Sequence, residues 1–126
     1  MVDTGRPDDD EIRRQLIALV QKKGKRKQQW TQQRPTDWRP AEVHDPEWKV
    51  CLTTPRAWDL ILNWLEDGRP VETKEMTLPS SETVWVHVMI EQLGNQMIYV
   101  KLEVLGGGQH VFGWSFHLSE RSIPDG

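Results

Sequence analysis

Three segments near the C-terminus carry the side chains of this chain that can do chemistry. Apolar and polar residues alternate in each segment, which is typical of a β-strand with one apolar face. Histidine transfers protons near neutral pH, tyrosine and lysine do so where their surroundings help, and lysine also stabilises negative charge on phosphate. Together such groups can cleave RNA, which needs a base for the 2′-hydroxyl, a cation for the phosphate and an acid for the leaving oxygen. The residues concerned are His87, Tyr99, Lys101, Ser115 and His117.

The same side chains have a simpler interpretation. The outward face of a sheet normally carries polar residues in contact with water, and these become cross-strand neighbours without any function. Catalysis and a solvated sheet face therefore both fit the pattern, and the way in which the strands pair decides how close the side chains come.

We predict four strands, over residues 71–78, 83–90, 97–104 and 110–117, joined in an antiparallel meander. A three-residue turn over 93–95 keeps apolar residues opposite one another, and it places Met89 opposite Tyr99 and His87 opposite Lys101. The same argument around the glycine run 106–108 places polar residues in two adjacent rows. The other predicted pairs are Ile90–Ile98, Val88–Val100, Val86–Leu102, Val84–Val104, Val104–Phe112, Leu102–Trp114, Lys101–Ser115, Val100–Phe116 and Tyr99–His117.

Two amphipathic helices precede the strands. Apolar residues recur at helical spacing over about 8–23, and a second helix is predicted to begin near Thr54 and to end at Gly68. Helices followed by strands indicate an α+β fold, with N-terminal helices packed on one face of a four-stranded antiparallel β-meander. We expect a charged N-terminal helix and basic arm over 1–50, a compact α+β core over 51–119 and a tail over 120–126.

Charge is distributed unevenly along the chain. The formal net charge is −3, yet nine basic residues and one acid lie between Arg13 and Arg39, whereas five basic residues and ten acids follow from Leu52 onward. A basic run followed by an aromatic residue is typical of an arm that binds nucleic acid, and a solvated charge run has the same composition. The residues of this candidate arm are Lys22, Lys23, Lys25, Arg26, Lys27 and Trp30.

Composition also limits the compartment and the cofactors. Cys51 is the only cysteine, so the chain has no internal disulfide and we expect a reducing, cytoplasmic environment. No apolar run approaches the ~20 residues of a membrane helix, so we expect no membrane partner. The four histidines have no short metal-ligand spacing, and we expect neither a metal nor another cofactor.

The predicted strands resemble a known family. Thr83-Val-Trp85, the run Ile98-Tyr99-Val100-Lys101-Leu102 and the closing Val111…Ser115-Phe116-His117 are similar to motifs of the MqsR family of bacterial toxins, over residues 71–118. Members of that family are messenger-RNA interferases of the RelE-like fold. The resemblance implies a metal-independent endoribonuclease of a toxin–antitoxin module, with RNA as substrate and a cognate antitoxin as protein partner.

The catalytic positions of that family fall on particular residues of this chain. The catalytic tyrosine falls on Tyr99, the lysine of the first strand on Lys74, the glutamine on Val86 and the C-terminal lysine on His117. His87 is adjacent to the glutamine position. We therefore expect the catalytic site to comprise Tyr99, Lys101, His117, His87 and Lys74.

Two other functions stay open. Seven tryptophans suit a non-catalytic protein-binding or regulatory protein, such as one of a mobile element, because tryptophan is enriched at interface hot spots. This hypothesis predicts a contiguous exposed apolar patch that includes Trp30, Trp38, Trp48 or Trp85. The third hypothesis is a nucleic-acid binder that uses the basic arm with strongly salt-dependent affinity.

Overall fold

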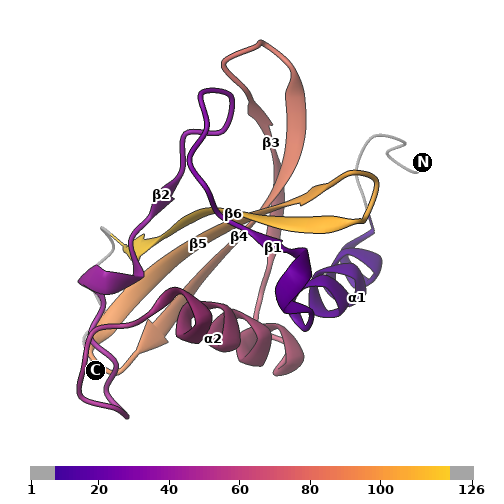
Figure 1. Ribbon diagram of the computed structural model, residues 1–126. Helices are drawn as coiled ribbons and strands as arrows, with labels where there is room; N and C mark the ends of the chain where they lie inside the picture. Colours follow the sequence, from indigo (N-terminus) through magenta and orange to yellow (C-terminus); the bar gives the residue numbers. More distant parts are fainter. Residues whose placement is uncertain (1–7, 120–126) are drawn as a thin grey trace.

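The computed structural model describes residues 8–119 (Figure 1). A mixed six-stranded sheet forms one layer, and both α-helices pack on the same face of it. The predicted α+β class is confirmed. The elements are α1 (Asp9–Val20), η1 (Lys23–Lys25), β1 (Arg26–Lys27), β2 (Asp37–Trp38), η2 (Pro40–Glu42), α2 (Thr54–Glu66), β3 (Glu72–Thr77), β4 (Thr83–Leu93), β5 (Gln96–Leu105) and β6 (His110–Leu118).

Local signals in the sequence set the ends of both helices. Asp8 caps α1, because its carboxylate accepts hydrogen bonds from two backbone N–H groups at 2.9 and 3.2 Å. α2 begins at Thr54, as predicted, and the hydroxyl of Thr53 caps it. Gly68 follows α2 with a φ of 77°, a left-handed conformation that glycine adopts without strain, so the predicted end is also confirmed.

The strands lie in the order β1-β6-β5-β4-β3, and β2 also pairs with β6. β3 to β6 form the predicted antiparallel meander. β1 and β2 are additional, and both run parallel to β6: β1 lies beside Val111 and Phe112, and β2 beside Ser115 and Phe116. The basic arm therefore covers the edge of β6 instead of extending away from the core.

The predicted register between β4 and β5 is wrong by one residue. A two-residue turn at 94–95 replaces the predicted three-residue turn, so Lys101 lies opposite Val88 and His87 lies opposite Leu102. A slip of one residue moves every side chain of a strand to the other face of the sheet. The observed pairs include Met89–Val100, Ile90–Tyr99 and Glu91–Ile98 in place of Met89–Tyr99, Val88–Val100 and Ile90–Ile98.

The prediction failed because it assumed a single apolar face. The face that we call the helix face packs Met89, Ile98, Val100 and Leu102 against α1 and α2. The opposite face, which we call the outer face, also buries an apolar cluster: Leu78, Val86, Phe112 and Trp114. Because both faces of β4 bury apolar residues, the strand lacks the difference between an apolar face and a polar face that normally specifies the register.

The second hairpin agrees with the prediction over half its length. The pairs Tyr99–His117, Val100–Phe116 and Lys101–Ser115 are confirmed. Beyond Lys101 a β-bulge shifts the pairing, and Leu102 lies opposite Gly113. The predicted pairs Leu102–Trp114 and Val104–Phe112 are therefore wrong, because the bulge directs both aromatic side chains into the cluster on the outer face.

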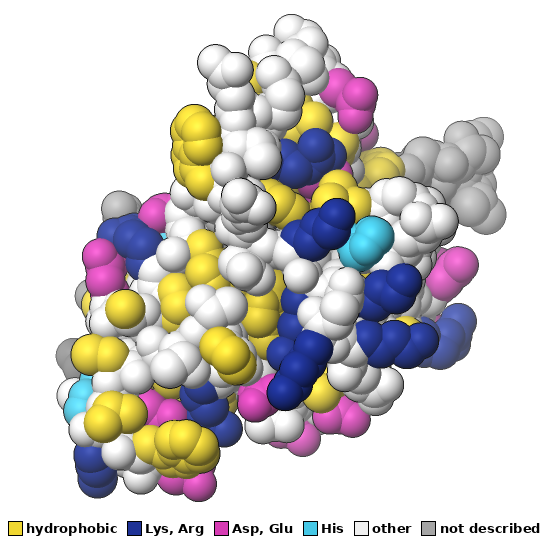
Figure 2. Space-filling model, viewed as in Figure 1, with side chains coloured by type: hydrophobic (Ala, Val, Ile, Leu, Met, Phe, Trp, Pro, Cys, Tyr) yellow, Lys and Arg dark blue, Asp and Glu magenta, His cyan; other side chains and the backbone are white. Residues whose placement is uncertain are grey.

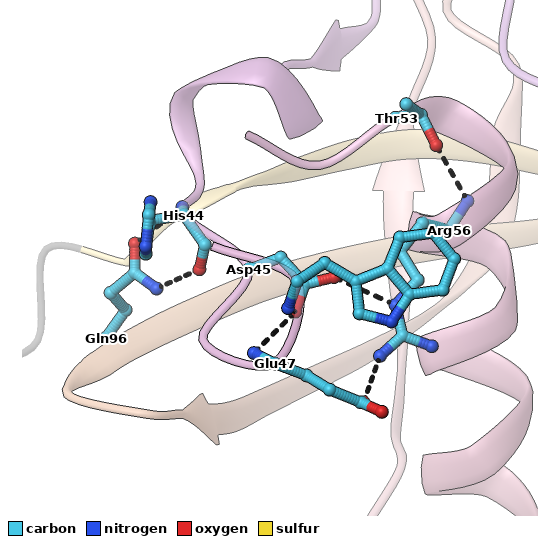
Figure 3. A network of polar contacts seen from close by, with 7 residues as sticks. His44, Asp45, Glu47, Thr53, Arg56 and Gln96 are labelled. Carbon is cyan, nitrogen blue, oxygen red and sulfur yellow. Dashed lines mark hydrogen bonds and ion pairs between the residues drawn. The ribbon is translucent and has the colours of Figure 1, made fainter. Parts of the chain in front are cut away.

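Polar contacts fasten the segment between η2 and α2 to the rest of the fold (Figure 3). Asp45 accepts hydrogen bonds from two backbone N–H groups of its own turn and from Nε of Arg56, the last at 3.0 Å. Arg56 also donates to Glu47 at 3.0 Å. The side-chain amide of Gln96 both donates to the carbonyl and accepts from the N–H of His44, at 2.7 and 3.0 Å. The segment is thereby tied to α2 and to the β4–β5 turn.

Trp38 connects the arm to the core. Its ring lies 4.9 Å from that of Trp58 and 5.5 Å from that of Phe116, measured between centroids, and its Nε1 donates to Oγ1 of Thr54 at 3.3 Å.

None of the helices within residues 8–119 combines the length and apolarity needed to cross a membrane.

Candidate functional site

A pocket of about 560 Å³ opens on the outer face, where the meander meets the segment that contains β2. β5 and β6 supply the side chains that can do chemistry, and the arm supplies one wall. The lining residues are Pro35, Asp37, Ile90, Tyr99, Lys101, Trp114, Ser115, His117 and Ser119.

Tyr99 and His117 form the centre of the pocket. They are cross-strand neighbours, and their rings stack with centroids 5.3 Å apart and planes inclined by 19°. Nδ1 of His117 lies 2.8 Å from the carbonyl oxygen of Leu118, and Nε2 lies 3.4 Å from Oδ2 of Asp37. Both neighbours accept hydrogen bonds, so the imidazole has a suitable partner for a proton on either nitrogen.

Asp37 is held in turn by Arg39. Nε of Arg39 lies 2.6 Å from Oδ1 of Asp37, and Nη2 donates to Oδ2 at 3.1 Å. A guanidinium that contacts both oxygens fixes the plane of a carboxylate. The chain Arg39–Asp37–His117 therefore orients the imidazole and partly neutralises the negative charge of the carboxylate.

Lys101 and Tyr99 are half-buried in the pocket. Burial lowers the pKa of Lys101, and the charge of Lys74 lowers it further, while Asp37 acts in the opposite direction. Nζ of Lys101 lies 3.4 Å from Sδ of Met76, a weak acceptor. Burial raises the pKa of Tyr99, and Glu72 adds to this effect, so the phenol keeps its proton and can donate it to an anionic ligand.

The structure brings together four of the five residues with which the sequence analysis began. Tyr99, Lys101, Ser115 and His117 line one pocket. His87 does not belong to this group: it lies on the helix face, 2 % exposed, and the predicted row of His87 with Lys101 is wrong.

Lys74 occupies a position at the margin of the site. It is exposed and does not line the pocket, yet its pairing with Val86 places it on the outer face with Lys101.

Asp37 is the ionisable residue of the pocket that sequence reasoning missed. It lies far from β6 along the chain, and only the parallel pairing of β2 with β6 brings it to His117. One signal was available, since Asp37 is the only acid between Arg13 and Arg39. A single carboxylate among many basic residues suggests that the carboxylate has a specific ion-pair partner. One more basic residue in such a segment would not carry this information.

The candidate nucleic-acid-binding residues separate into two groups. Lys22, Lys23 and Lys27 are exposed and Lys25 is half-exposed. Arg26 is different, because its side chain is 8 % exposed, donates to the carbonyl of Val20 at 2.7 Å, lies 3.6 Å from Asp59 and packs over the ring of Trp58. Arg26 therefore holds β1 to the helices.

The four tryptophans named for protein binding do not form one patch. Trp30 and Trp48 are 60 % and 64 % exposed, but they belong to loops at opposite ends of the molecule in Figure 1. Trp38 packs against Trp58, and Trp85 is half-buried.

The fold is α+β, and one face of its sheet carries a pocket lined by a histidine, a tyrosine and a lysine. Comparisons with protein-family models, with curated proteins and with solved structures find no match to this chain. The resemblance to the MqsR family therefore rests on the residues of β3 to β6 alone, and function has to be argued from the site.

Proposed function

We propose that this protein is an endoribonuclease that cleaves messenger RNA at the pocket on the outer face, as the toxin-like component of a toxin–antitoxin module. The observation that carries the proposal is the convergence of His117, Tyr99 and Lys101 on one pocket, with Asp37 beside Nε2 of the imidazole. An oriented imidazole, a neutral phenol and a half-buried ammonium are the groups that phosphodiester cleavage by the neighbouring hydroxyl requires.

The reaction assigns one role to each group. In the tautomer whose Nδ1–H is donated to the carbonyl of Leu118, Nε2 of His117 has a free lone pair. Nε2 accepts the proton of the 2′-hydroxyl while the 2′-oxygen forms a bond to phosphorus, and Asp37, on the side of Nε2, stabilises the imidazolium that results. The bond from phosphorus to the 5′-oxygen breaks, and Lys101 gives a proton to that oxygen, for which its lowered pKa makes it a better donor than an ordinary lysine. Tyr99 donates a hydrogen bond to a non-bridging oxygen as charge develops. The products are a 2′,3′-cyclic phosphate and a 5′-hydroxyl.

The resemblance to the MqsR family supports the same site. The positions that correspond to the family's catalytic residues are Lys74, Val86, Tyr99 and His117, and the pairing of β3 to β6 directs all four to the outer face. Val86 has no polar group, and His87 beside it faces the helices, so neither replaces the glutamine of the family. In this chain His117 and Lys101 supply the proton-transfer chemistry instead, with Asp37 beside the imidazole.

The test is cleavage of a messenger RNA by the purified protein in the presence of a metal chelator. We expect products with cyclic phosphate ends, and a rate lowered by roughly 10²–10⁴-fold in His117→Ala and also lowered in Tyr99→Phe. His44→Ala is the matched control, because His44 is exposed and holds Gln96 through backbone atoms only. Absence of cleavage, or equal rates in His117→Ala and His44→Ala, would refute the proposal.

A further inference from the structure

Four lysines and a histidine gather where η1 and β1 meet the start of β6. Figure 2 shows Lys and Arg side chains beside a histidine over these elements. β1 runs beside the start of β6, with Arg26 paired to Val111 and Lys27 to Phe112, so Lys25 and Lys27 flank the position of His110. Burial lowers the pKa of His110, and the charges of Lys27 and Lys25 lower it further. Within residues 8–119 none of the four lysines forms an ion pair with an acid. We call this set the lysine patch: Lys22, Lys23, Lys25, Lys27 and His110.

Strand pairing places two members of this patch, Lys27 and His110, on the same face of the sheet as the pocket. Lys23 lies at the border of that face, because it also lines a pocket with Trp58 of α2. Along β5 the outer face carries Tyr99 and Lys101 at one end and Leu105 at the other. His110 is opposite Leu105, and Lys27 is beside Phe112 of the outer cluster. Lys27 and His110 therefore lie at one end of β6 and the pocket at the other, both on the outer face, and the other lysines of the patch adjoin Lys27 along the chain.

A further cation lies between them. Arg34 donates to both carboxylate oxygens of Glu103 at 2.9 Å, and its guanidinium lies 5.9 Å from the ring centroid of Phe112. Phe112 lies between His110 and Ser115 along β6, so Arg34 lies between the lysine patch and the pocket. Trp30, 60 % exposed, belongs to the same connecting segment between β1 and β2.

We propose that the lysine patch binds the phosphate backbone of single-stranded RNA and leads that strand along β6 into the pocket, with Trp30 stacking on a base. His117 lies seven residue steps beyond His110 along β6, roughly 23 Å at about 3.3 Å per step, which a single strand of roughly four to seven nucleotides spans. Unpaired lysines held side by side repel one another, and a polyanion relieves that repulsion.

Single-stranded RNA fits this surface better than a duplex or a membrane. An exposed indole stacks on bases that are unpaired, whereas a duplex hides them. The acidic remainder of the chain, with ten acids and five basic residues from Leu52 onward, disfavours the wide contact that a flat anionic membrane makes. The inference rests on the proposed function in one respect only, since it takes the pocket as the place to which the strand leads.

The experiment measures binding without cleavage. Full-length His117→Ala protein is titrated into a labelled single-stranded RNA of about twelve nucleotides at several salt concentrations, and fluorescence anisotropy gives the affinity. We expect the triple substitution Lys23→Gln, Lys25→Gln, Lys27→Gln to reduce the slope of log affinity against log salt by about two, since each neutralised phosphate contact contributes ~0.7. Trp30→Ala should weaken binding by about tenfold at fixed salt, with little change of slope.

Lys49→Asn is the matched control, because Lys49 is an exposed lysine outside the patch and asparagine tolerates its φ of 62°. Equal slopes in the triple variant and in Lys49→Asn would overturn the inference, as would equal affinity for a duplex, or binding only to vesicles of anionic phospholipid.

The two proposals fail in different ways. If wild-type protein cleaves RNA and the triple variant binds and cleaves as well as wild type, the lysine patch is refuted and the endoribonuclease stands. If the triple variant loses binding but no form of the protein cleaves RNA, the binding surface stands and the endoribonuclease is refuted.

Discussion

Nδ1 of His87 lies 2.9 Å from Oγ1 of Thr73, and the two residues face each other across β3 and β4 beneath the helices. Both side chains are buried, at 2 % and 5 % exposure. The hydroxyl can donate to a neutral imidazole, so the pair satisfies two polar groups inside an apolar layer. Burial lowers the pKa of His87 to about 4.

This pair predicts a loss of stability in mild acid. Unfolded chain binds a proton at His87 near pH 6.5, whereas folded chain does so only near pH 4, so the free energy of unfolding falls as pH falls between these values. The loss attributable to His87 is on the order of 3 kcal/mol. In His87→Gln, which keeps a hydrogen-bonding group but does not titrate, urea unfolding should show a shallower dependence on pH across this range. His44→Gln should keep the slope of wild type, and an unchanged slope in His87→Gln would contradict the prediction.

The buried ion pair of Asp45 with Arg56 predicts a stability effect of another kind. Burial opposes ionisation of Asp45, but Arg56 and two backbone N–H groups outweigh it and lower the pKa of the carboxyl. Arg56→Met leaves this carboxylate without its cation, and we expect unfolding to become easier by roughly 3 kcal/mol. Arg39→Met is the control for stability, since that guanidinium is 46 % exposed and its removal should have only a small effect. Similar melting temperatures for the two variants would refute this account.

We predict that a side chain added at Gly113, beside the β-bulge, disturbs the packing of the protein. A Cβ atom there would overlap carbon atoms of the Trp38 ring, which packs directly on the strand. Gly113→Ala should therefore displace the indole and destabilise the protein by about 2 kcal/mol. Intrinsic fluorescence and chemical unfolding measure the two effects. The double variant Gly113→Ala, Trp38→Phe should recover part of the loss, because the smaller ring makes room; a wild-type melting temperature in Gly113→Ala would exclude the contact.

We predict that a substitution of Lys101 lowers the activity of the protein without lowering its stability. The ammonium is half-buried, and its neighbours within residues 8–119 include a thioether and the ring of Trp114 at 5.6 Å. The charge of Lys74 repels it and that of Asp37 attracts it, but burial and Lys74 outweigh Asp37. Lys101→Met keeps the packing and removes the desolvated charge, so the melting temperature should stay equal or rise while cleavage falls by at least about 10²-fold. A variant that melts much lower than wild type would assign Lys101 a structural role.

The helices and the existence of the strands follow from local sequence. The cap at Asp8, the glycine after α2 and the alternation in β4 to β6 are signals that neighbouring residues carry. The pairs Tyr99–His117 and Lys101–Ser115 also follow, because the alternation in β5 and β6 matches over this half of the hairpin. Those two pairs already bring most of the pocket together.

The rest depends on contacts between distant segments. β1 and β2 are two residues each and have no strand pattern of their own, so only pairing with β6 creates them. Asp37 enters the pocket by that route. The face on which His87 lies depends on whether the turn between β4 and β5 has two or three residues. Because both faces of β4 bury apolar side chains, the apolar pattern does not distinguish these two turn lengths.

The central place of β6 has a consequence for how the protein is made. Among the strands within residues 8–119, β6 leaves the ribosome last, yet it lies between β5 on one side and the arm strands β1 and β2 on the other. The arm is synthesised early and has no sheet edge to join until β6 has emerged. Loop closure over such a separation is slow, so the nascent chain exposes the arm until β6 is made, and it exposes the edge of β5 in the interval between β5 and β6. Truncation before β6 would therefore leave the product without a complete sheet.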